Sequence, residues 1–157
     1  MHQWQEIIET ESDIRRILGE PTQSQQTKCI DHIDKHCRAW IERCPFVVVC
    51  SADASGTMDV SPKGDPPGFV RVLDDRTLIV PDRRGNRRAD TFLNVLQNPN
   101  VALIFLMPKR GETLAVSGKA RIVRDDVLLG GMVMGGKKPD LALEVTVSQA
   151  MFHCGKS

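Results

Sequence analysis

Residues 46–60 read Phe-Val-Val-Val-Cys-Ser-Ala-Asp-Ala-Ser-Gly-Thr-Met-Asp-Val, a pattern that indicates a β-hairpin. The first five residues form an apolar run rich in β-branched side chains, which is typical of a buried strand. Residues 52–56 are small or polar and end in glycine, as in a tight turn. We therefore expect a second strand over 57–60.

Further strands follow on the carboxyl side of this hairpin. Residues 141–153 alternate, with Leu143, Val145 and Val147 set against polar neighbours. One helix is expected at 88–97, ended by Asn98-Pro99, and a shorter one at 125–129. Because the strands do not alternate strictly with helices, a parallel doubly wound sheet is disfavoured and a small antiparallel barrel is favoured. The remaining expected strands cover 69–73, 77–80, 101–107 and 112–123.

Helices are expected on the amino side of the hairpin. Residues 11–18 place Ile14, Ile17 and Leu18 on one face. Residues 27–43 carry apolar side chains at steps of three and four, which predicts a longer amphipathic helix. We therefore expect a single domain in which residues 1–44 form a helical segment packed on a barrel of residues 45–157.

Size, charge and composition exclude several classes of protein. The chain has 157 residues, with 21 Lys and Arg against 20 Asp and Glu, for a net charge of +1. A dedicated nucleic-acid binder would carry a large cationic excess. No apolar run is long enough to span a membrane, and the first residues lack the pattern of a signal peptide. We expect a cytoplasmic protein whose five cysteines are reduced thiols.

The densest polar cluster is Pro-Asp-Arg-Arg-Gly-Asn-Arg-Arg at 81–88, between an expected strand and an expected helix. The free N–H groups at the start of a helix favour a phosphate, and guanidinium groups bind phosphate oxygens in pairs. An ordinary exposed turn is the alternative. A second candidate is the loop 59–68, whose prolines and glycines would present Ser61, Lys63 and Asp65, although a plain turn explains its composition equally well.

A metal site and a hydrolytic site receive less support. Cys29, His32 and His36 would share one stripe of the helix expected over 27–43, so they could bind zinc. A tetrahedral zinc site needs a fourth ligand, and partly buried side chains along the helix are the simpler interpretation. No serine or cysteine has the sequence context of a catalytic nucleophile.

Several motifs in sequence order resemble the pyridoxamine 5′-phosphate oxidase-like, FMN-binding split-barrel flavoproteins. The Gly-Ser-Arg-Lys-Ala signature of the oxidases is matched by Gly-Asn-Arg-Arg-Ala at 85–89. Their Asn-Pro-led strand is matched at 98–105, and the end of the next strand at 117–120. Segments 59–65, 80–87, 36–38 and 152–154 are similar to a bacterial branch of FMN-dependent proteins in this superfamily.

The resemblance implies a mainly β (α+β) fold: a six-stranded antiparallel split β-barrel with N-terminal helices and one inserted helix. It also implies a homodimer with FMN at the subunit interface. Arg87 and Arg88 would hold the FMN phosphate, and residues 60–63 would line the isoalloxazine ring through backbone groups. The implied cofactor-binding residues are Val60, Ser61, Pro62, Lys63, Asp82, Asn86, Arg87, Arg88 and Thr113.

Three of these positions differ from the oxidases. Asn86 stands where the signature has serine, Asp82 where the oxidases place a threonine contact, and Thr113 where they place a glutamine. The substrate-phosphate residues of the oxidases have no counterpart in this chain, so pyridoxamine phosphate is not the expected substrate.

The function implied is that of an FMN-dependent oxidoreductase acting on a small organic substrate. The flavin carries the redox chemistry, so no catalytic residue and no metal are expected. A cation such as Lys63 near the pyrimidine end would raise the reduction potential of the flavin. The alternative is a non-catalytic protein that binds or stores a flavin, a deazaflavin or haem on the same barrel.

Overall fold

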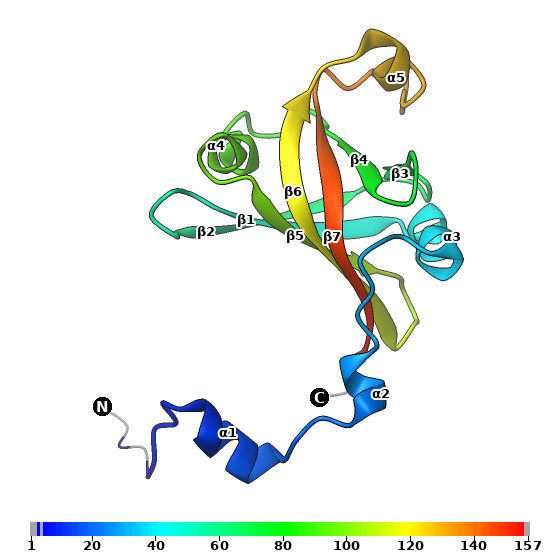
Figure 1. The fold of residues 1–157 in the computed structure, drawn as a ribbon. Coiled ribbons are helices and arrows are strands. Elements are labelled where there is room, and N and C mark those ends of the chain that lie inside the picture. Colours follow the sequence, from blue (N-terminus) through cyan, green and yellow to red (C-terminus); the bar gives the residue numbers. More distant parts are fainter. Residues whose placement is uncertain (1–2, 4, 156–157) are drawn as a thin grey trace.

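The protein is built on one antiparallel sheet, seen in a computed structural model that describes residues 3 and 5–155 (Figure 1). The strands are ordered β2-β1-β5-β6-β7-β4-β3, and β2 and β3 at the two edges do not pair with each other. The sheet is therefore an open, split barrel, which confirms the expected fold class. The described residues form seven strands rather than the six that the resemblance implies: β1 (Phe46–Ala52), β2 (Met58–Gly64), β3 (Arg71–Val72), β4 (Thr77–Pro81), β5 (Asn100–Leu106), β6 (Glu112–Val123) and β7 (Ala142–Cys154).

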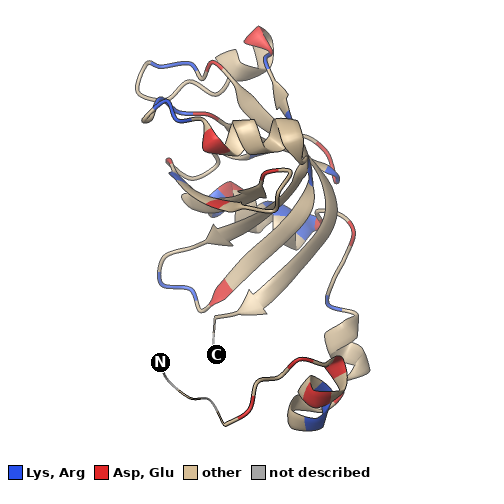
Figure 2. Cartoon of the chain, turned by 90° about the vertical axis from the view of Figure 1, so that its left-hand side faces the viewer, with Lys and Arg blue, Asp and Glu red and all other residues tan. Residues whose placement is uncertain are grey.

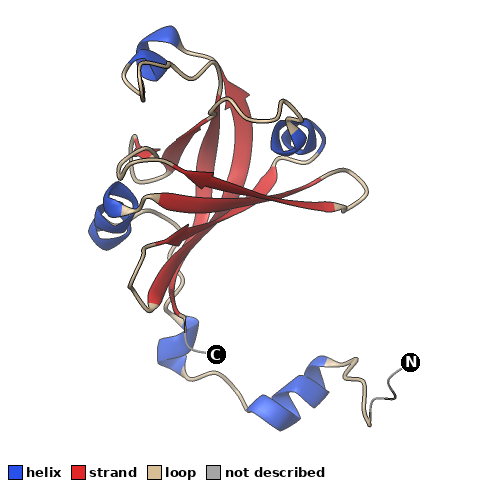
Figure 3. Cartoon of the chain, turned by 180° about the vertical axis from the view of Figure 1, so that it is seen from behind, coloured by secondary structure: helices blue, strands red, loops and turns tan. Residues whose placement is uncertain are grey.

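Helices α3, α4 and α5 lie around this sheet (Figure 3). Helix α4 packs against β1, β2 and β6, and α3 packs against β3. Within the described part of the chain, none of the helices combines the length and the apolar character that a membrane crossing requires. The helices formed by the described residues are α1 (Glu11–Leu18), α2 (Gln23–Gln26), α3 (Lys35–Arg43), α4 (Asp90–Gln97) and α5 (Asp126–Gly130).

The core follows from the alternation of side chains along the strands. In β1, Val47, Val49 and Ser51 are buried while their neighbours are partly exposed. Because successive strand side chains point to opposite faces, these residues line the inner face of the sheet. A smaller apolar cluster lies elsewhere on the sheet and joins α5 to β4 and β7 through Ile79, Leu129, Met132 and Ala142.

The helix expected over 27–43 is wrong in its first half. Ile30 instead pairs with Ala150, each backbone N–H donating to the other carbonyl at 3.0 and 2.7 Å. Helix α3 begins only after Asp34, whose carboxylate accepts hydrogen bonds from the backbone N–H groups of His36 and Cys37. A long-range β-bridge and a strong N-cap therefore override the helical periodicity.

The helices before residue 35 differ in packing from α3. Neither α1 nor α2 has a buried residue, whereas α3 buries Cys37 and Ile41. Figure 1 shows α1 and α2 extending away from the sheet. Residues 1–2, 4 and 156–157, at the ends of the two expected segments 1–44 and 45–157, lie outside the described residues.

Strands β6 and β7 pair along their whole length, from Glu112 opposite Cys154 to Val123 opposite Ala142. A shift in register between Ser117 and Gly118 interrupts this ladder. A Cβ atom at position 118 would lie 2.9 Å from the carbonyl carbon of Thr146, inside van der Waals contact. The close approach of the two backbones at this bulge therefore requires glycine.

We expect Gly118→Ala to lower the free energy of unfolding by about 1–3 kcal/mol, because the added methyl group must push β6 and β7 apart. Urea unfolding followed by circular dichroism measures the change. Gly111→Ala is the matched control, since a Cβ there meets nothing within 4 Å. Equal stabilities of the two variants would contradict the packing argument.

Candidate functional site

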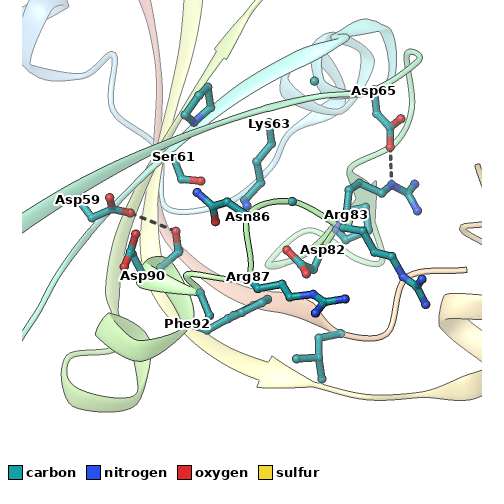
Figure 4. A pocket seen from close by; sticks show the side chains of 18 of the residues that line it. Asp59, Ser61, Lys63, Asp65, Asp82, Arg83, Asn86, Arg87, Asp90 and Phe92 are labelled. Carbon is teal, nitrogen blue, oxygen red and sulfur yellow. Dashed lines mark hydrogen bonds and ion pairs between the residues drawn. The ribbon is translucent and has the colours of Figure 1, made fainter. Parts of the chain in front are cut away.

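A pocket of about 940 Å³ lies between β2, the end of β4 and the start of α4 (Figure 4). This volume is within the range of small-molecule and cofactor sites. The loop 82–89 closes one side, and Asp140 and Leu141, just before β7, contribute to the wall. The lining residues are Asp59–Asp65, Phe69, Pro81–Arg87, Ala89–Phe92, Asp140 and Leu141.

Strand β2 supplies one wall through its alternation. Asp59, Ser61 and Lys63 are partly buried, while the residues between them are exposed. Figure 4 shows the Ser61 and Lys63 side chains pointing into the pocket, with Lys63 directed toward Asn86. One hydroxyl and one ammonium group thus face the pocket from a strand, whose backbone holds their spacing.

The loop 82–89 contains two residues in a strained backbone conformation. Arg87 and Ala89 have φ angles of 62° and 59°, in the left-handed region that costs an L-residue about 1–2 kcal/mol. The Asn86 side-chain oxygen accepts a hydrogen bond from the Arg88 N–H at 3.0 Å, which supports this turn. Strain of this kind concentrates at binding and catalytic sites, so it marks the loop as a candidate.

The start of α4 leaves backbone donors beside the pocket. Its N-cap residue is Ala89, which has no side-chain oxygen and makes no capping hydrogen bond. The first N–H groups of a helix have no partner within the helix, so they attract an anion. Ala89 and Thr91 both line the pocket, which places this end of α4 in its wall.

Arg87 and Arg88 point to different surroundings. Arg87 lines the pocket, and Figure 4 shows its guanidinium extending beneath Asp82. Among the described residues, Arg87 has no ion-pair partner within 4 Å, whereas Arg88 pairs with Asp90 at 2.7 Å and does not line the pocket. Arg87 is therefore the cation of this pair that is available to an anion in the pocket.

A partly buried ion pair fixes the far wall. Arg83 pairs with Asp65 at 2.6 Å, and both side chains are only partly exposed. Arg83 also donates to the backbone carbonyl of Met132 at 2.9 Å. The guanidinium therefore ties the loop after β2 to the segment after α5, and its charge is neutralised locally.

The pocket wall contains one carboxyl, that of Asp82, whose pKa is shifted by its surroundings. Burial raises the pKa of its carboxyl above the ordinary value, while the positive charges of Lys63 and Arg83 oppose this shift. Its backbone N–H donates to the carbonyl of Leu141 at 2.9 Å, which holds the residue at the junction of β4 and β7.

Two further polar contacts fix α4 against the sheet. The Thr91 hydroxyl donates to Asp59 at 3.3 Å, and the Asn94 amide donates to the hydroxyl of Ser51 at 3.1 Å. Ser51 and Thr91 are the buried polar residues of the described core. Because buried polar groups require partners, these bonds set the position of α4 relative to β1 and β2.

The structure brings together seven of the nine residues that the sequence analysis expects to bind a cofactor: Val60, Ser61, Pro62, Lys63, Asp82, Asn86 and Arg87. Arg88 and Thr113 do not line the pocket. Thr113 on β6 pairs with His153 on β7. His153 lies eleven residues along β7 from Ala142, which pairs with Pro81 in the pocket wall. At the rise per residue of a β-strand, Thr113 is therefore roughly 35 Å along the sheet from Pro81.

The apolar walls and the residues before β7 were not predicted from the sequence. Phe69 and Phe92 line the pocket but carry no polar signal. Asp140 and Leu141 join the site because β7 pairs with β4, with Ala142 opposite Pro81. No local pattern in the sequence pairs these two strands, so only the strand order of the sheet places Asp140 and Leu141 in the site.

The helical stripe expected for a zinc site is not formed. Cys29 and His32 lie in the non-helical segment before α3, and only His36 is helical. In the part of the chain that the structure describes, no group of three His, Cys, Asp or Glu side chains is arranged to hold a metal ion.

We expect Asp82→Asn to stabilise the ligand-free protein at neutral pH more than at acid pH. A carboxyl whose pKa is raised by folding stabilises the protein below its unfolded pKa of 3.8, and this contribution is lost as the pH rises through the folded pKa. Asparagine stays neutral and avoids this loss. Melting temperatures between about pH 4 and pH 7 measure the effect, and a difference that does not grow with pH would contradict burial as its cause.

Comparison with solved structures shows the same fold in proteins of low sequence identity. HupZ from Group A Streptococcus is 20% identical, with 75% of this chain and 91% of that chain covered at a TM-score of 0.59. An FMN-binding protein from Syntrophomonas wolfei is 12% identical, with 73% and 82% covered at 0.58. HutZ, the heme storage protein from Vibrio cholerae, is 12% identical, with 78% and 94% covered at 0.51. These identities establish likeness of fold alone.

Comparison of sequences assigns the family. No curated protein matches the chain. The family model for pyridoxamine 5′-phosphate oxidase, in contrast, matches residues 33–154, which include α3, every strand of the sheet and the whole pocket. The chain therefore belongs to the pyridoxamine 5′-phosphate oxidase family.

Proposed function

We propose that this protein binds FMN in the pocket beside β2 and acts as an FMN-dependent oxidoreductase on a small organic substrate. The observation that carries the proposal is the free Arg87 guanidinium in a pocket of about 940 Å³, next to the uncapped start of α4. This donor set suits a phosphate monoester, because it combines a guanidinium fork with backbone N–H groups. The residues present therefore fit FMN.

The residues of the pocket divide into a phosphate end and a ring end. Arg87 would bind the phosphate, and the Asn86 amide would remain free to donate because its oxygen already accepts from Arg88. Residues 60–63 of β2 would line the ring, with Lys63 at its edge. Arg88 would join the phosphate site only by leaving Asp90, its partner in the ligand-free chain.

We also propose that FMN lies between two copies of the chain. Met58, Val60, Leu93 and Leu96 are large apolar side chains exposed on β2 and α4, next to the pocket. Such a group of apolar side chains is typical of a surface that a partner covers. Thr113 is remote from its own pocket, so it would contact a flavin only in the partner subunit.

Bound FMN would supply the transfer of a hydride or of electrons. The protein would orient the ring, exclude water and adjust the charge around it. Lys63 would stabilise negative charge on the reduced pyrimidine end and so raise the reduction potential. Asp82, close enough for the Lys63 charge to act on its pKa, would moderate that effect.

The second candidate function is passive binding or storage of a flavin, a deazaflavin or haem, and the likeness of fold to a heme storage protein favours it. Haem iron usually takes His, Cys, Met or Tyr as an axial ligand. None of these residue types occurs among the described residues that line the pocket, which favours a flavin over haem at this position.

We expect Arg87→Ala to weaken FMN binding by about 10- to 100-fold, because it removes a charge-assisted contact to the phosphate. Quenching of FMN fluorescence on titration with protein measures the dissociation constant. Arg88→Ala is the matched control and should change it by less than about threefold, since Arg88 is engaged with Asp90. An unchanged dissociation constant for FMN in Arg87→Ala would show that Arg87 does not bind the phosphate.

Stopped-flow mixing of the FMN-loaded protein with NADH or NADPH separates an enzyme from a passive carrier. An oxidoreductase should lose its visible flavin absorbance rapidly and regain it on addition of an electron acceptor. Reduction no faster than that of free FMN with both donors would favour the carrier.

A further inference from the structure

A second, smaller cavity of about 280 Å³ adjoins the pocket. The two share six lining residues: Gly64, Asp65, Asp82, Arg83, Arg84 and Asp140. The smaller cavity, here called the annex, adds Met134, Lys137, Lys138 and Pro139 from the segment between α5 and β7. Because the same six residues line both, the annex and the pocket are direct neighbours.

Within the described residues, two cations of the annex make no ion pair, and the carboxylates of Asp82 and Asp140 share its wall with them. Of its four basic residues, Arg83 pairs with Asp65 and Lys138 pairs with Asp126. Among the described residues, Arg84 and Lys137 have no ion-pair partner within 4 Å. Figure 2 shows the Lys and Arg residues of these segments gathered on neighbouring loops at one end of the molecule.

A defined turn presents Lys137. Met134 and Lys137 exchange backbone hydrogen bonds at 3.1 and 2.9 Å, and the two residues between them are Gly135 and Gly136. Both glycines have positive φ, 54° and 74°, as a two-residue hairpin turn of type I′ requires. The Arg83 bond to the Met132 carbonyl ties this segment to the pocket wall.

Arg87 and Lys137 each belong to one of the two cavities, whereas Arg84 lines both. Arg87 lines the pocket but not the annex, and Lys137 lines the annex but not the pocket. A phosphate held by Arg87 therefore leaves Lys137 without an anion.

We propose that the annex binds the anionic end of the substrate, a carboxylate or a phosphate group, through Lys137 and Arg84. The proposal rests on the proposed function in that it takes the larger pocket to be the flavin site. The substrate class is then a small organic anion, whose charged group lies in the annex and whose reacting part extends toward the flavin ring. Asp140, in the shared wall, would disfavour a second negative charge near the ring.

Calorimetric titration of the FMN-saturated protein with inorganic pyrophosphate and, separately, with citrate tests this site. We expect at least one of the two to bind with a stoichiometry of one, and the stronger binder identifies phosphate or carboxylate as the preferred group. Lys137→Glu should raise that dissociation constant about tenfold or more, because attraction becomes repulsion. Lys137→Arg should stay within about threefold of the wild-type protein.

Lys109→Glu is the matched control, because it makes the same charge reversal on the exposed turn between β5 and β6. It should bind the probe like the wild-type protein, and Lys137→Glu should bind FMN like the wild-type protein. Failure of both probes to bind, or equal weakening by Lys137→Glu and Lys109→Glu, would overturn the annex site. If FMN itself does not bind, the same titrations of ligand-free Arg87→Ala protein test the annex alone, so the two failures are distinguishable.

Discussion

The pairing of β7 with both β4 and β6 determines where the site lies. Over Ala142–Thr146 this strand pairs with β4 on one side and with β6 on the other. The pairing fixes Pro81 opposite Ala142, and the bond from Asp82 to Leu141 continues it by one residue. The charged loop therefore leaves the sheet at the same end as the segment after α5. Without this backbone ladder, neither the pocket nor the annex would have a second wall.

Several charged side chains in and beside the pocket are paired with a side chain of opposite charge, and the chain as a whole has little net charge. The chain has nearly equal numbers of acidic and basic residues, and within the site Asp65 neutralises Arg83 and Asp90 neutralises Arg88. What remains available is a small set of cations at defined positions, Lys63, Arg84, Arg87 and Lys137. The net charge of the chain therefore does not predict an anion site here. Which cations are paired, and which are not, determines where an anion can bind.

Local patterns in the sequence were sufficient for most of the fold and for much of the pocket. Strand periodicity and turn residues located the strands, because these signals depend on near neighbours. The segment before α3 was mispredicted because its pairing with Ala150 is a long-range contact that no local pattern contains. The left-handed conformations of Arg87 and Ala89 were equally hidden, since neither residue is glycine or asparagine. The annex was missed because its cations come from segments that only the sheet brings together.

The position of Pro62 in β2 has a consequence for the behaviour of the protein in solution. Strand β2 is an edge of the sheet, and an edge strand can template pairing with another molecule. Proline fits a paired strand with its nitrogen toward the open side, where it has no hydrogen to donate. With Asp59 and Lys63 on the same strand, this edge resists continuous strand addition and hence aggregation. A ligand or a folded partner can still contact this edge, whereas continuous addition of strands, as in a fibril, is opposed by the proline and the charged side chains.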